Sequence, residues 1–550
     1  MFVRVFYLFI FLLNCCVLGI RYKLTEITLD TSFGKIRGFE REHYSRFAGI
    51  PYGLVNETNP FGNAQPHPYL KPDDIELSNN LAVCPQHDKG VIVGKIQCLH
   101  LHVYKPNDIT PGSTLPVMVF IHGLDFSKGS GSSIMFQPDY LLRHNVIVVM
   151  VDYRLGPYGH LCLPQTEYTN QALKDQNLAL KWVKNHIGSF GGDSDNILLF
   201  GQDSGSVSVE HHLLYTKEVL FNKVILQSGV SVSPFWNQAT DIATLVKDVG
   251  LDAENIDVDL FIKKISAIDT TTMINMTKFY DFRPCVDGEF ITKTPNMRNL
   301  ENIKLMIGGT EHEMRYFYPT EDLHGCLDFA GELNNSFSFS KMADNTDAID
   351  EVKQFYNNYT NLNIVDFASD LSFNYPLERT IRYYVQNKCT VYRYLFSYDG
   401  NRNFMKIKNN ITSAGSVHGD ELGYLFVMRA IEPYADKTTK EDQVIIDRMT
   451  LMWTNFAKYR DPTPKTSELL PVKWTPVTAG AKRYLQIDKN LELHNGRPFE
   501  ERMAFWDSFF EKYGKYAKGI SLEESFTENR TSAVDSSTLL LLISISLLII

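Results

Sequence analysis

The stretch Leu198-Leu-Phe-Gly-Gln-Asp-Ser-Gly-Ser-Val-Ser-Val-Glu-His-His-Leu-Leu214 decides the fold of this chain. An apolar run, a glycine-containing turn and a second apolar segment follow one another, which predicts a buried strand, a tight turn and a helix. Gly201 and Gly205 flank the turn, where the backbone must bend sharply and the helix must pack closely on the strand. The stretch therefore predicts a nucleophile elbow, in which a strained turn lifts one side chain above a sheet.

The segment from Gly201 to Gly205 fits the elbow pattern G-x-S-x-G with one displacement. Aligning the two glycines puts Asp203 at the central position and leaves Ser204 one residue late. Because a helix turns by about 100° per residue, Ser204 cannot point in the direction that residue 203 takes. The side chain that the elbow presents is thus a carboxylate, and the functional interpretation depends on it.

The remaining apolar patterns predict an α/β fold. Leu115–Ile121 and Val146–Val151 are short, continuous and rich in β-branched residues, as central strands of a mostly parallel sheet are. Ala172–Ile187 places apolar residues on one helical face, and so does the segment from Ile445 to Tyr459. Residues 26–40 alternate as an antiparallel hairpin does. Further strands are predicted at 196–201, 223–229, 304–308 and 390–398. We expect one domain with a mostly parallel central sheet flanked by helices.

Composition narrows the class of protein. The chain has 550 residues, 44% of them hydrophobic, and a formal net charge of −10 at pH 7. This composition supplies a large core, and the acidic balance argues against nucleic acid as a partner, because neutralising phosphates requires a basic surface. The sequence contains no glycine-rich phosphate loop, CxxC pair or HExxH segment. We therefore predict neither a metal ion nor an organic cofactor.

Both ends of the chain carry addressing patterns. Residues 1–19 combine Arg4, an apolar run and a small residue at the end, which is the layout of a secretory signal peptide. A folded domain is predicted at 20–516, a polar spacer at 517–538 and an apolar tail at 539–550. The tail is too short to span a bilayer, because a spanning helix needs about 20 apolar residues.

The spacer and the tail together match the signal for a glycosylphosphatidylinositol (GPI) anchor. Small residues before the tail would take the glycolipid, and Asn529 or Ser532 is the predicted attachment site. A single-pass tail anchor is the alternative, which the short tail without basic residues behind it disfavours. We predict a chain that enters the secretory pathway and is held at the extracellular face of the plasma membrane by a lipid anchor.

Secretion makes the cysteines and the glycosylation sequons informative. In an oxidising compartment the cysteines that follow the leader are disulfide candidates. Spacing alone does not decide how four of them pair, namely Cys162, Cys285, Cys326 and Cys389. Asn-x-Ser/Thr sequons are expected to carry glycans where they are exposed. They stand at Asn56, Asn275, Asn334, Asn358, Asn410 and Asn529.

Short motifs in a fixed order connect the elbow to a known family. They are Phe47-Ala-Gly-Ile-Pro-Tyr52, Cys98-Leu-x-Leu-x-Val-Tyr104, Val119-Phe-Ile-His-Gly123, Asp152-Tyr-Arg-Leu-Gly156, Asp175-Gln176 with Ala179-Leu-Lys-Trp-Val183, Phe190-Gly-Gly-Asp193, Gln227-Ser-Gly229, Val286-Asp-Gly288, His418-Gly-Asp-Glu421 and Trp453-x-x-Phe-Ala457. In this set and order the chain resembles the type-B carboxylesterase and cholinesterase family over nearly the whole predicted domain. The resemblance implies the α/β-hydrolase fold.

The resemblance also assigns roles to single residues. The family's triad acid precedes an aromatic pair, which gives Glu313, and its histidine opens a His-Gly-Asp/Glu-Glu motif, which gives His418. The nucleophilic serine is replaced by Asp203. Acyl transfer needs a serine alkoxide and an acyl-serine ester, and a carboxylate supplies neither, so losses of about 10⁴ to 10⁶ in ester hydrolysis are expected. The resemblance further implies a disulfide between Cys84 and Cys98.

The predicted oxyanion side departs from the family as well. Where the family reads His-Gly-Gly-Gly-Phe, this chain keeps Gly123 and then has Leu124 and Asp125. Glycines there let backbone N–H groups approach the developing oxyanion, and Asp125 is expected to repel negative charge. The third donor of the family corresponds to the backbone N–H of Ser204. We expect Asp203 to form a buried ion pair with His418 beside the positive end of the following helix.

Three functions compete on this basis. The first is a non-catalytic cell-surface glycoprotein, similar to the cholinesterase-like adhesion molecules that keep the fold and lack the nucleophile. It would bind an extracellular protein or an apolar small molecule. The second is a hydrolase in which Asp203 itself attacks, as the elbow aspartate of epoxide hydrolases does. The third is residual ester hydrolysis through Ser204. The loop between Cys84 and Cys98 contains no tryptophan, so acetylcholine is not the expected ligand.

Overall fold

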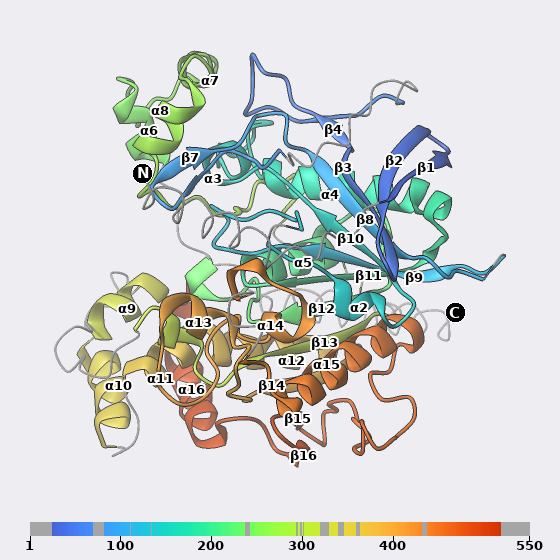
Figure 1. Ribbon diagram of the computed structural model, residues 1–550. Helices are drawn as coiled ribbons and strands as arrows, with labels where there is room; N and C mark the ends of the chain where they lie inside the picture. Colours follow the sequence, from blue (N-terminus) through green and yellow to red (C-terminus); the bar gives the residue numbers. More distant parts are fainter. Residues whose placement is uncertain are drawn as a thin grey trace, which may run out of the picture.

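A large mixed sheet forms the centre of the molecule in the computed structural model (Figure 1). The structure describes residues 25–69, 82–110, 112–133, 135–236, 242–292, 295–296, 300, 302–318, 329–338, 346–358, 364–431 and 437–518. Within these ranges the sheet has 12 strands. Their order across the sheet is β1 (Thr25–Thr31), β2 (Gly34–Glu40), β3 (Tyr44–Pro51), β8 (His100–Pro106), β10 (Ile147–Val151), β9 (Leu115–Ile121), β11 (Gly192–Gln202), β12 (Lys223–Gln227), β13 (Lys304–Thr310), β14 (Thr390–Phe396), β15 (Arg483–Ile487) and β16 (Leu491–Asn495).

The middle of the sheet is parallel and its two edges are antiparallel. Parallel pairing runs from β10 through β9, β11, β12, β13 and β14 to β15. The predicted hairpin at 26–40 is the antiparallel pair of β1 and β2 at one edge. The prediction of a mostly parallel sheet flanked by helices is confirmed. The antiparallel pair of β15 and β16 at the other edge was not predicted from the sequence.

Alternate residues of the central strands feed two separate cores. In β9 the side chains of Val117 and Val119 belong to one buried cluster, whereas Met118 and Phe120 belong to the other. Neighbouring residues of a strand point to opposite faces, so a continuous apolar run is what a strand with both faces covered requires. This explains why the central strands carry no polar face.

Helices cover both faces of the sheet. Leu173, Leu180 and Val183 of α4 (Gln171–His186) pack in the first cluster, with residues of α5 (Ser204–Tyr215) and α12 (Tyr375–Gln386). The long helix α15 (Lys440–Tyr459) packs in the second cluster. It begins at a capping box, in which Thr439 and Asp442 each accept the other's backbone N–H. Figure 1 shows α4 and α15 on opposite sides of the strands.

Two smaller helical regions flank one end of the sheet (Figure 1). The first contains α6 (Ile242–Asp248), α7 (Val258–Ser266) and α8 (Thr270–Met276), which share a small apolar cluster of their own. The second contains α9 (Phe329–Ser336), α10 (Thr346–Asn358), α11 (Ile364–Ser369) and α16 (Glu500–Tyr513), packed around Trp506. The candidate site lies where loops from the sheet meet these regions.

Two disulfides cross-link the described part of the chain. Cys84 is bonded to Cys98, and Cys162 is bonded to Cys285, a pairing that the sequence left open. Cys389 is buried as a thiol whose pKa burial raises to about 12, and Cys326 lies outside the described residues. Disulfides are typical of proteins that pass through the secretory pathway.

Four of the sequon asparagines are exposed, namely Asn56, Asn275, Asn334 and Asn410. The side chain of Asn358 lies outside the described residues, and so does Asn529. The predicted signal peptide at 1–19, the apolar tail at 539–550, all but the first residues of the spacer and the candidate anchor site Ser532 also fall outside them. In the described part of the chain, no helix is both long enough and apolar enough to cross a membrane.

Candidate functional site

The elbow has the geometry that its glycines permit. Asp203 stands between β11 and α5 with φ 61° and ψ −134°, a backbone conformation that L residues rarely adopt. A side chain on Gly205 would overlap the carbonyl of Ile121, and one on Gly201 would overlap the backbone of Gly205. The helix therefore starts against the strand, and the strained turn directs the Asp203 side chain away from both.

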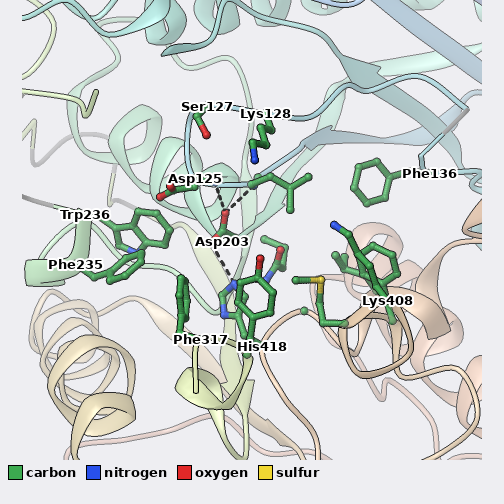
Figure 2. A pocket seen from close by; sticks show the side chains of 18 of the residues that line it. Asp125, Ser127, Lys128, Phe136, Asp203, Phe235, Trp236, Phe317, Lys408 and His418 are labelled. Atoms are coloured by element: carbon green, nitrogen blue, oxygen red, sulfur yellow. Dashed lines mark hydrogen bonds and ion pairs between the residues drawn. The ribbon is translucent and has the colours of Figure 1, made fainter. Parts of the chain in front are cut away.

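Asp203, His418 and Glu313 lie in one hydrogen-bonded line (Figure 2). The Nε2 of His418 is 3.1 Å from the Oδ1 of Asp203, and its Nδ1 is 2.7 Å from the Oε2 of Glu313. The other oxygen of Glu313 accepts hydrogen bonds from Ser228 Oγ and the Thr310 backbone N–H, each at 2.7 Å. All three members of the line are buried.

The line is an ionic triad at neutral pH. Burial alone would lower the pKa of His418, but its hydrogen bonds to Asp203 and Glu313 and their charges raise it to about 10. Burial would raise the pKa of Asp203, but the hydrogen bond to His418, its charge and nearby backbone N–H groups lower it. His418 is thus an imidazolium between two carboxylates, and a protonated imidazole cannot accept a proton.

The oxyanion loop donates to Asp203. The backbone N–H groups of Leu124 and Asp125 lie 2.6 and 2.9 Å from the Oδ2 of Asp203. Leu124, Asp125 and Phe126 have φ values of 79°, 62° and 55°, a conformation that favours glycine. Replacement of the two glycines was expected to withdraw these N–H groups from the site, and the structure shows that it does not. They are directed into the site and are occupied by the carboxylate of the chain itself.

The negative charge of Asp125 is neutralised by an arginine. Arg283 donates to both the side chain and the backbone carbonyl of Asp125 and forms an ion pair with Asp281. In Figure 2 the Asp125 carboxylate points away from that of Asp203. The expected repulsion between Asp125 and an anion at the elbow is therefore reduced by the Arg283 charge. No sequence pattern pointed to Arg283, which lies 158 residues from Asp125 and belongs to no motif.

Ser204 does not reach the open part of the site. Its side chain is fully buried, and its hydroxyl donates to the Oδ2 of Asp203 at 3.1 Å. The same hydroxyl accepts the backbone N–H of Phe126 at 3.0 Å. Ser204 thus connects the first turn of α5 to the oxyanion loop, in keeping with its position one residue after the elbow apex.

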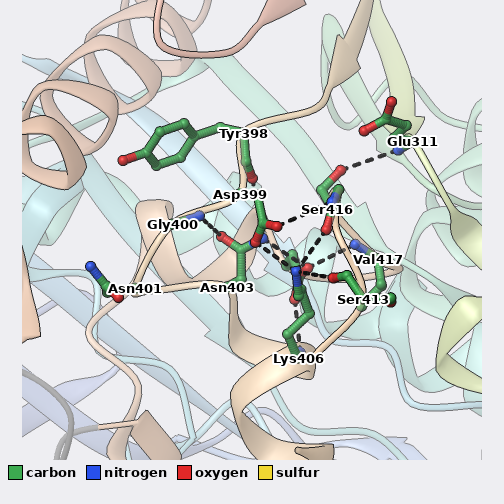
Figure 3. Close-up of polar contacts among 12 residues, drawn as sticks. Glu311, Tyr398, Asp399, Gly400, Asn401, Asn403, Lys406, Ser413, Ser416 and Val417 are labelled. Carbon is green, nitrogen blue, oxygen red and sulfur yellow. Dashed lines mark hydrogen bonds and ion pairs between the residues drawn. The ribbon is translucent and has the colours of Figure 1, made fainter. Parts of the chain in front are cut away.

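Polar contacts fix the loop that carries His418 (Figure 3). The Nζ of Lys406 donates to Asp399 Oδ1 and Ser413 O, each at 2.6 Å, and to Gly415 O at 3.0 Å. The carboxylate of Asp420 accepts the backbone N–H of Val417 at 2.7 Å. These contacts hold the backbone on both sides of His418, so the imidazole is positioned before any ligand arrives.

A cavity of about 190 Å³ opens above Asp203 and His418. Gly123, Leu124 and Asp125 also line it. Aromatic residues make up half of the remaining lining, namely Phe120, Phe136, Phe235, Trp236, Tyr316, Phe317 and Phe404. Lys128 and Lys408 line it as well, and no sequence pattern pointed to them. Among the described residues, no three His, Cys, Asp or Glu side chains gather as metal ligands would.

Residues 25–506 match the sequence model described as the carboxylesterase family. The chain belongs to the type-B carboxylesterase family. Bile salt-activated lipase of Rattus norvegicus is 29% identical over 513 residues, which cover 84% of this chain and 81% of that protein. Esterase E4 of Myzus persicae is 28% identical over 494 residues, covering 80% of this chain and 87% of that protein.

A solved structure of the carboxylesterase family is also similar. Juvenile hormone esterase from Manduca sexta, crystallised with OTFP covalently attached, has a TM-score of 0.75 and 26% sequence identity. The match covers 88% of this chain and all of that chain. In the present chain, Glu313 and His418 are in hydrogen-bonding contact, and the carboxylate of Asp203 stands at the elbow apex.

Proposed function

We propose that this carboxylesterase-family protein is a non-hydrolytic glycoprotein of the cell surface, which uses its site or its outer surface for binding. One observation carries the proposal. The carboxylate of Asp203 occupies the backbone N–H groups of Leu124 and Asp125 and is paired with His418. The charge that a carbonyl oxygen would develop during acyl transfer therefore has no free donor at these two groups.

The chemistry of the triad supports the same proposal. Ester hydrolysis of the family type needs a neutral imidazole that removes the proton of a nucleophile. With a pKa of about 10, only about one His418 side chain in a thousand is neutral at pH 7. Loss of a single oxyanion donor costs about 10² to 10³ in rate, and here two are taken. The effects act on the same step, so turnover is expected to be negligible.

The two catalytic alternatives are less well supported. Attack by Ser204 would need its hydroxyl in the cavity, and the hydroxyl is buried between Asp203 and Phe126. Attack by Asp203 on an sp³ carbon is favoured by one observation, its position at the floor of the cavity. Hydrolysis of the resulting ester would then require His418 to activate water as a base, and its raised pKa opposes this.

The proposed location follows from several features together. The leader at 1–19, the exposed sequons and the two disulfides support passage through the secretory pathway. The spacer and tail at 517–550 support a GPI anchor at Asn529 or Ser532. Its partner would be an extracellular protein or a small apolar molecule. Release from intact cells by phosphatidylinositol-specific phospholipase C tests the anchor, and retention on the cells would contradict it.

The main test is an activity panel on the purified glycoprotein. Hydrolysis of nitrophenyl and naphthyl esters, hydrolysis of an epoxide and labelling by a fluorophosphonate are measured in parallel. The proposal expects all three to stay at background. Labelling of Ser204 would overturn it in favour of an esterase. Epoxide hydrolysis that disappears in Asp203→Asn would instead establish the carboxylate as a nucleophile.

A further inference from the structure

We propose that the cavity above Asp203 binds a single-chain anionic amphiphile, whose head group is held by Lys128 and Lys408 and whose apolar chain lies against the aromatic wall. The inference rests on the proposed binding function, because it names the kind of molecule that the site would hold. It is carried by the position of the two lysines, the charges around them and the apolar lining.

The two lysines come from different parts of the chain and meet at the cavity. Lys128 lies in the loop after β9, and Lys408 lies in α13 (Phe404–Asn409). Figure 2 shows both side chains at the edge of the cavity, with the Lys408 nitrogen turned toward its open space near Phe136. Neither ammonium group has an ion-pair partner among the residues that the structure describes. The two therefore form a cationic rim.

The rim has an electrostatic cost that an anion would relieve. Burial lowers the pKa of Lys408, and the positive charges of Lys128 and Lys89 lower it further. Asp88 is the acidic group that acts against these cations. Lys128 and Lys408 form no ion pair within the described part of the chain, so an anion bound at the rim would offset the repulsion between their charges.

The other charged side chains at the cavity already have ion-pair partners within the protein. Asp125 is paired with Arg283. Asp203 and Glu313 share the positive charge of His418, which leaves the floor with a net negative charge. The N–H groups that would otherwise receive an anion at the floor are occupied by Asp203. An anionic head group is thus repelled from the floor and attracted to the rim, so the cavity fixes the direction of its ligand.

The wall between rim and floor suits the chain of such a ligand. In Figure 2, Phe136 lies on the lysine side of the cavity, and Phe235, Trp236 and Phe317 lie on the other. Leu124 and Met405 also line the cavity. Burial of apolar surface supplies most of the affinity in cavities of this kind, and a few polar groups set the orientation. The volume of about 190 Å³ limits the part that is enclosed to one short acyl segment.

A head-group series on the full-length glycoprotein tests this assignment. Binding of decanoate, decanol and decylamine is measured by displacement of 11-(dansylamino)undecanoic acid. Decyl phosphate is included to distinguish a carboxylate from a phosphate head group. The variants are Lys128→Met, Lys408→Met and the double variant, which keep most of the side-chain volume. Lys278→Met is the matched control, because Lys278 lines the neighbouring cavity and not this one.

We expect decanoate or decyl phosphate to bind at least tenfold more tightly than decanol, and decylamine to bind most weakly. Each lysine variant should weaken the anion by about tenfold and leave decanol unchanged, because only the charged hydrogen bond is lost. The Lys278→Met variant should behave as the wild type. Equal affinities for decanoate and decanol, or unchanged anion binding in the double variant, would overturn the assignment.

The result separates this inference from the proposed function. Lysine-dependent anion binding in a protein that also hydrolyses esters would keep the site and reject the non-hydrolytic function. A protein that shows no turnover and binds no amphiphile would keep the non-hydrolytic function and reject the amphiphile site. A thermal unfolding curve for each variant excludes misfolding as the reason for lost binding, and an intact fold with unchanged decanol binding is required before any loss is assigned to the lysines.

Discussion

Replacing Asp203 with serine should create ester hydrolysis in this chain. The substitution removes the carboxylate that occupies the N–H groups of Leu124 and Asp125, and it places a hydroxyl where His418 can reach it. The strained backbone at the elbow apex and the hydrogen bond from His418 to Glu313 remain. The substitution supplies the nucleophile of a serine hydrolase triad, and the base and the acid are already in place as His418 and Glu313.

The structure sets the size of the expected gain. The pKa of His418 is about 10, so returning it to its ordinary value would raise its neutral fraction at pH 7 by about 10² to 10³. Each freed oxyanion donor is worth about 10² to 10³ in rate. These gains overlap, because Glu313 continues to favour the protonated imidazole. We therefore expect the Asp203→Ser variant to hydrolyse nitrophenyl acetate at least 10³-fold faster than the wild type.

The assay combines steady-state hydrolysis with fluorophosphonate labelling. Asp203→Asn is the matched control, since it removes the charge without adding a nucleophile and should gain nothing. Asp203→Ser combined with His418→Ala should lose the gain. If Asp203→Ser unfolds at the same temperature as the wild type, gains less than tenfold and takes no label, the claim that Asp203 blocks the donors and the base is refuted.

Other predictions concern the charges and cross-links around the site. The raised pKa of His418 stabilises the fold fully below about pH 6.5, and this contribution is lost as the pH rises through about 10. Chemical denaturation should show that the free energy of unfolding falls between pH 6 and pH 10, and that it falls by roughly 2 kcal/mol less in Asp203→Asn than in the wild type. An equal fall in both proteins would contradict the ion pair. Arg283→Met should lower the free energy of unfolding by about 1 kcal/mol, because the half-exposed Asp125 carboxylate loses its ion pair; an unchanged value would mean that the pair does not stabilise the loop. Replacing Cys162 and Cys285 by alanine opens a loop with a sequence separation of 123 and should cost about 5 kcal/mol; a loss below about 1 kcal/mol would speak against this disulfide in solution.

The central fold could be predicted because its signals are local. Leu115–Ile121 and Val146–Val151 are apolar at every position, and only a strand covered on both faces needs such a run. The edge hairpin of β15 and β16 was missed for the opposite reason. Its sequences, Arg-Tyr-Leu-Gln-Ile and Leu-Glu-Leu-His-Asn, are half polar, as befits a sheet edge with one wet face, and they resemble many surface segments.

The candidate site was predictable in its members but not in its contacts. Asp203, Glu313 and His418 could be named from the order of the motifs, although they are separated by more than 100 residues. The sequence could not assign Arg283 to Asp125, because the two residues share no spacing and no motif. It also gave no reason to join Lys128 to Lys408, since exposed lysines occur throughout the chain and only folding brings these two to one cavity.

By itself, the sequence determined that a strand, a turn and a helix form an elbow, and that its apex carries aspartate in place of serine. Periodicity and residue identity decide these points, and both are written along the chain. Only the tertiary structure decided that the carboxylate of Asp203 takes the N–H groups of the oxyanion loop and turns His418 into an imidazolium. Hydrogen-bond direction and charge coupling depend on distances of about 3 Å between residues that are 78 to 215 positions apart, and those distances exist only after folding.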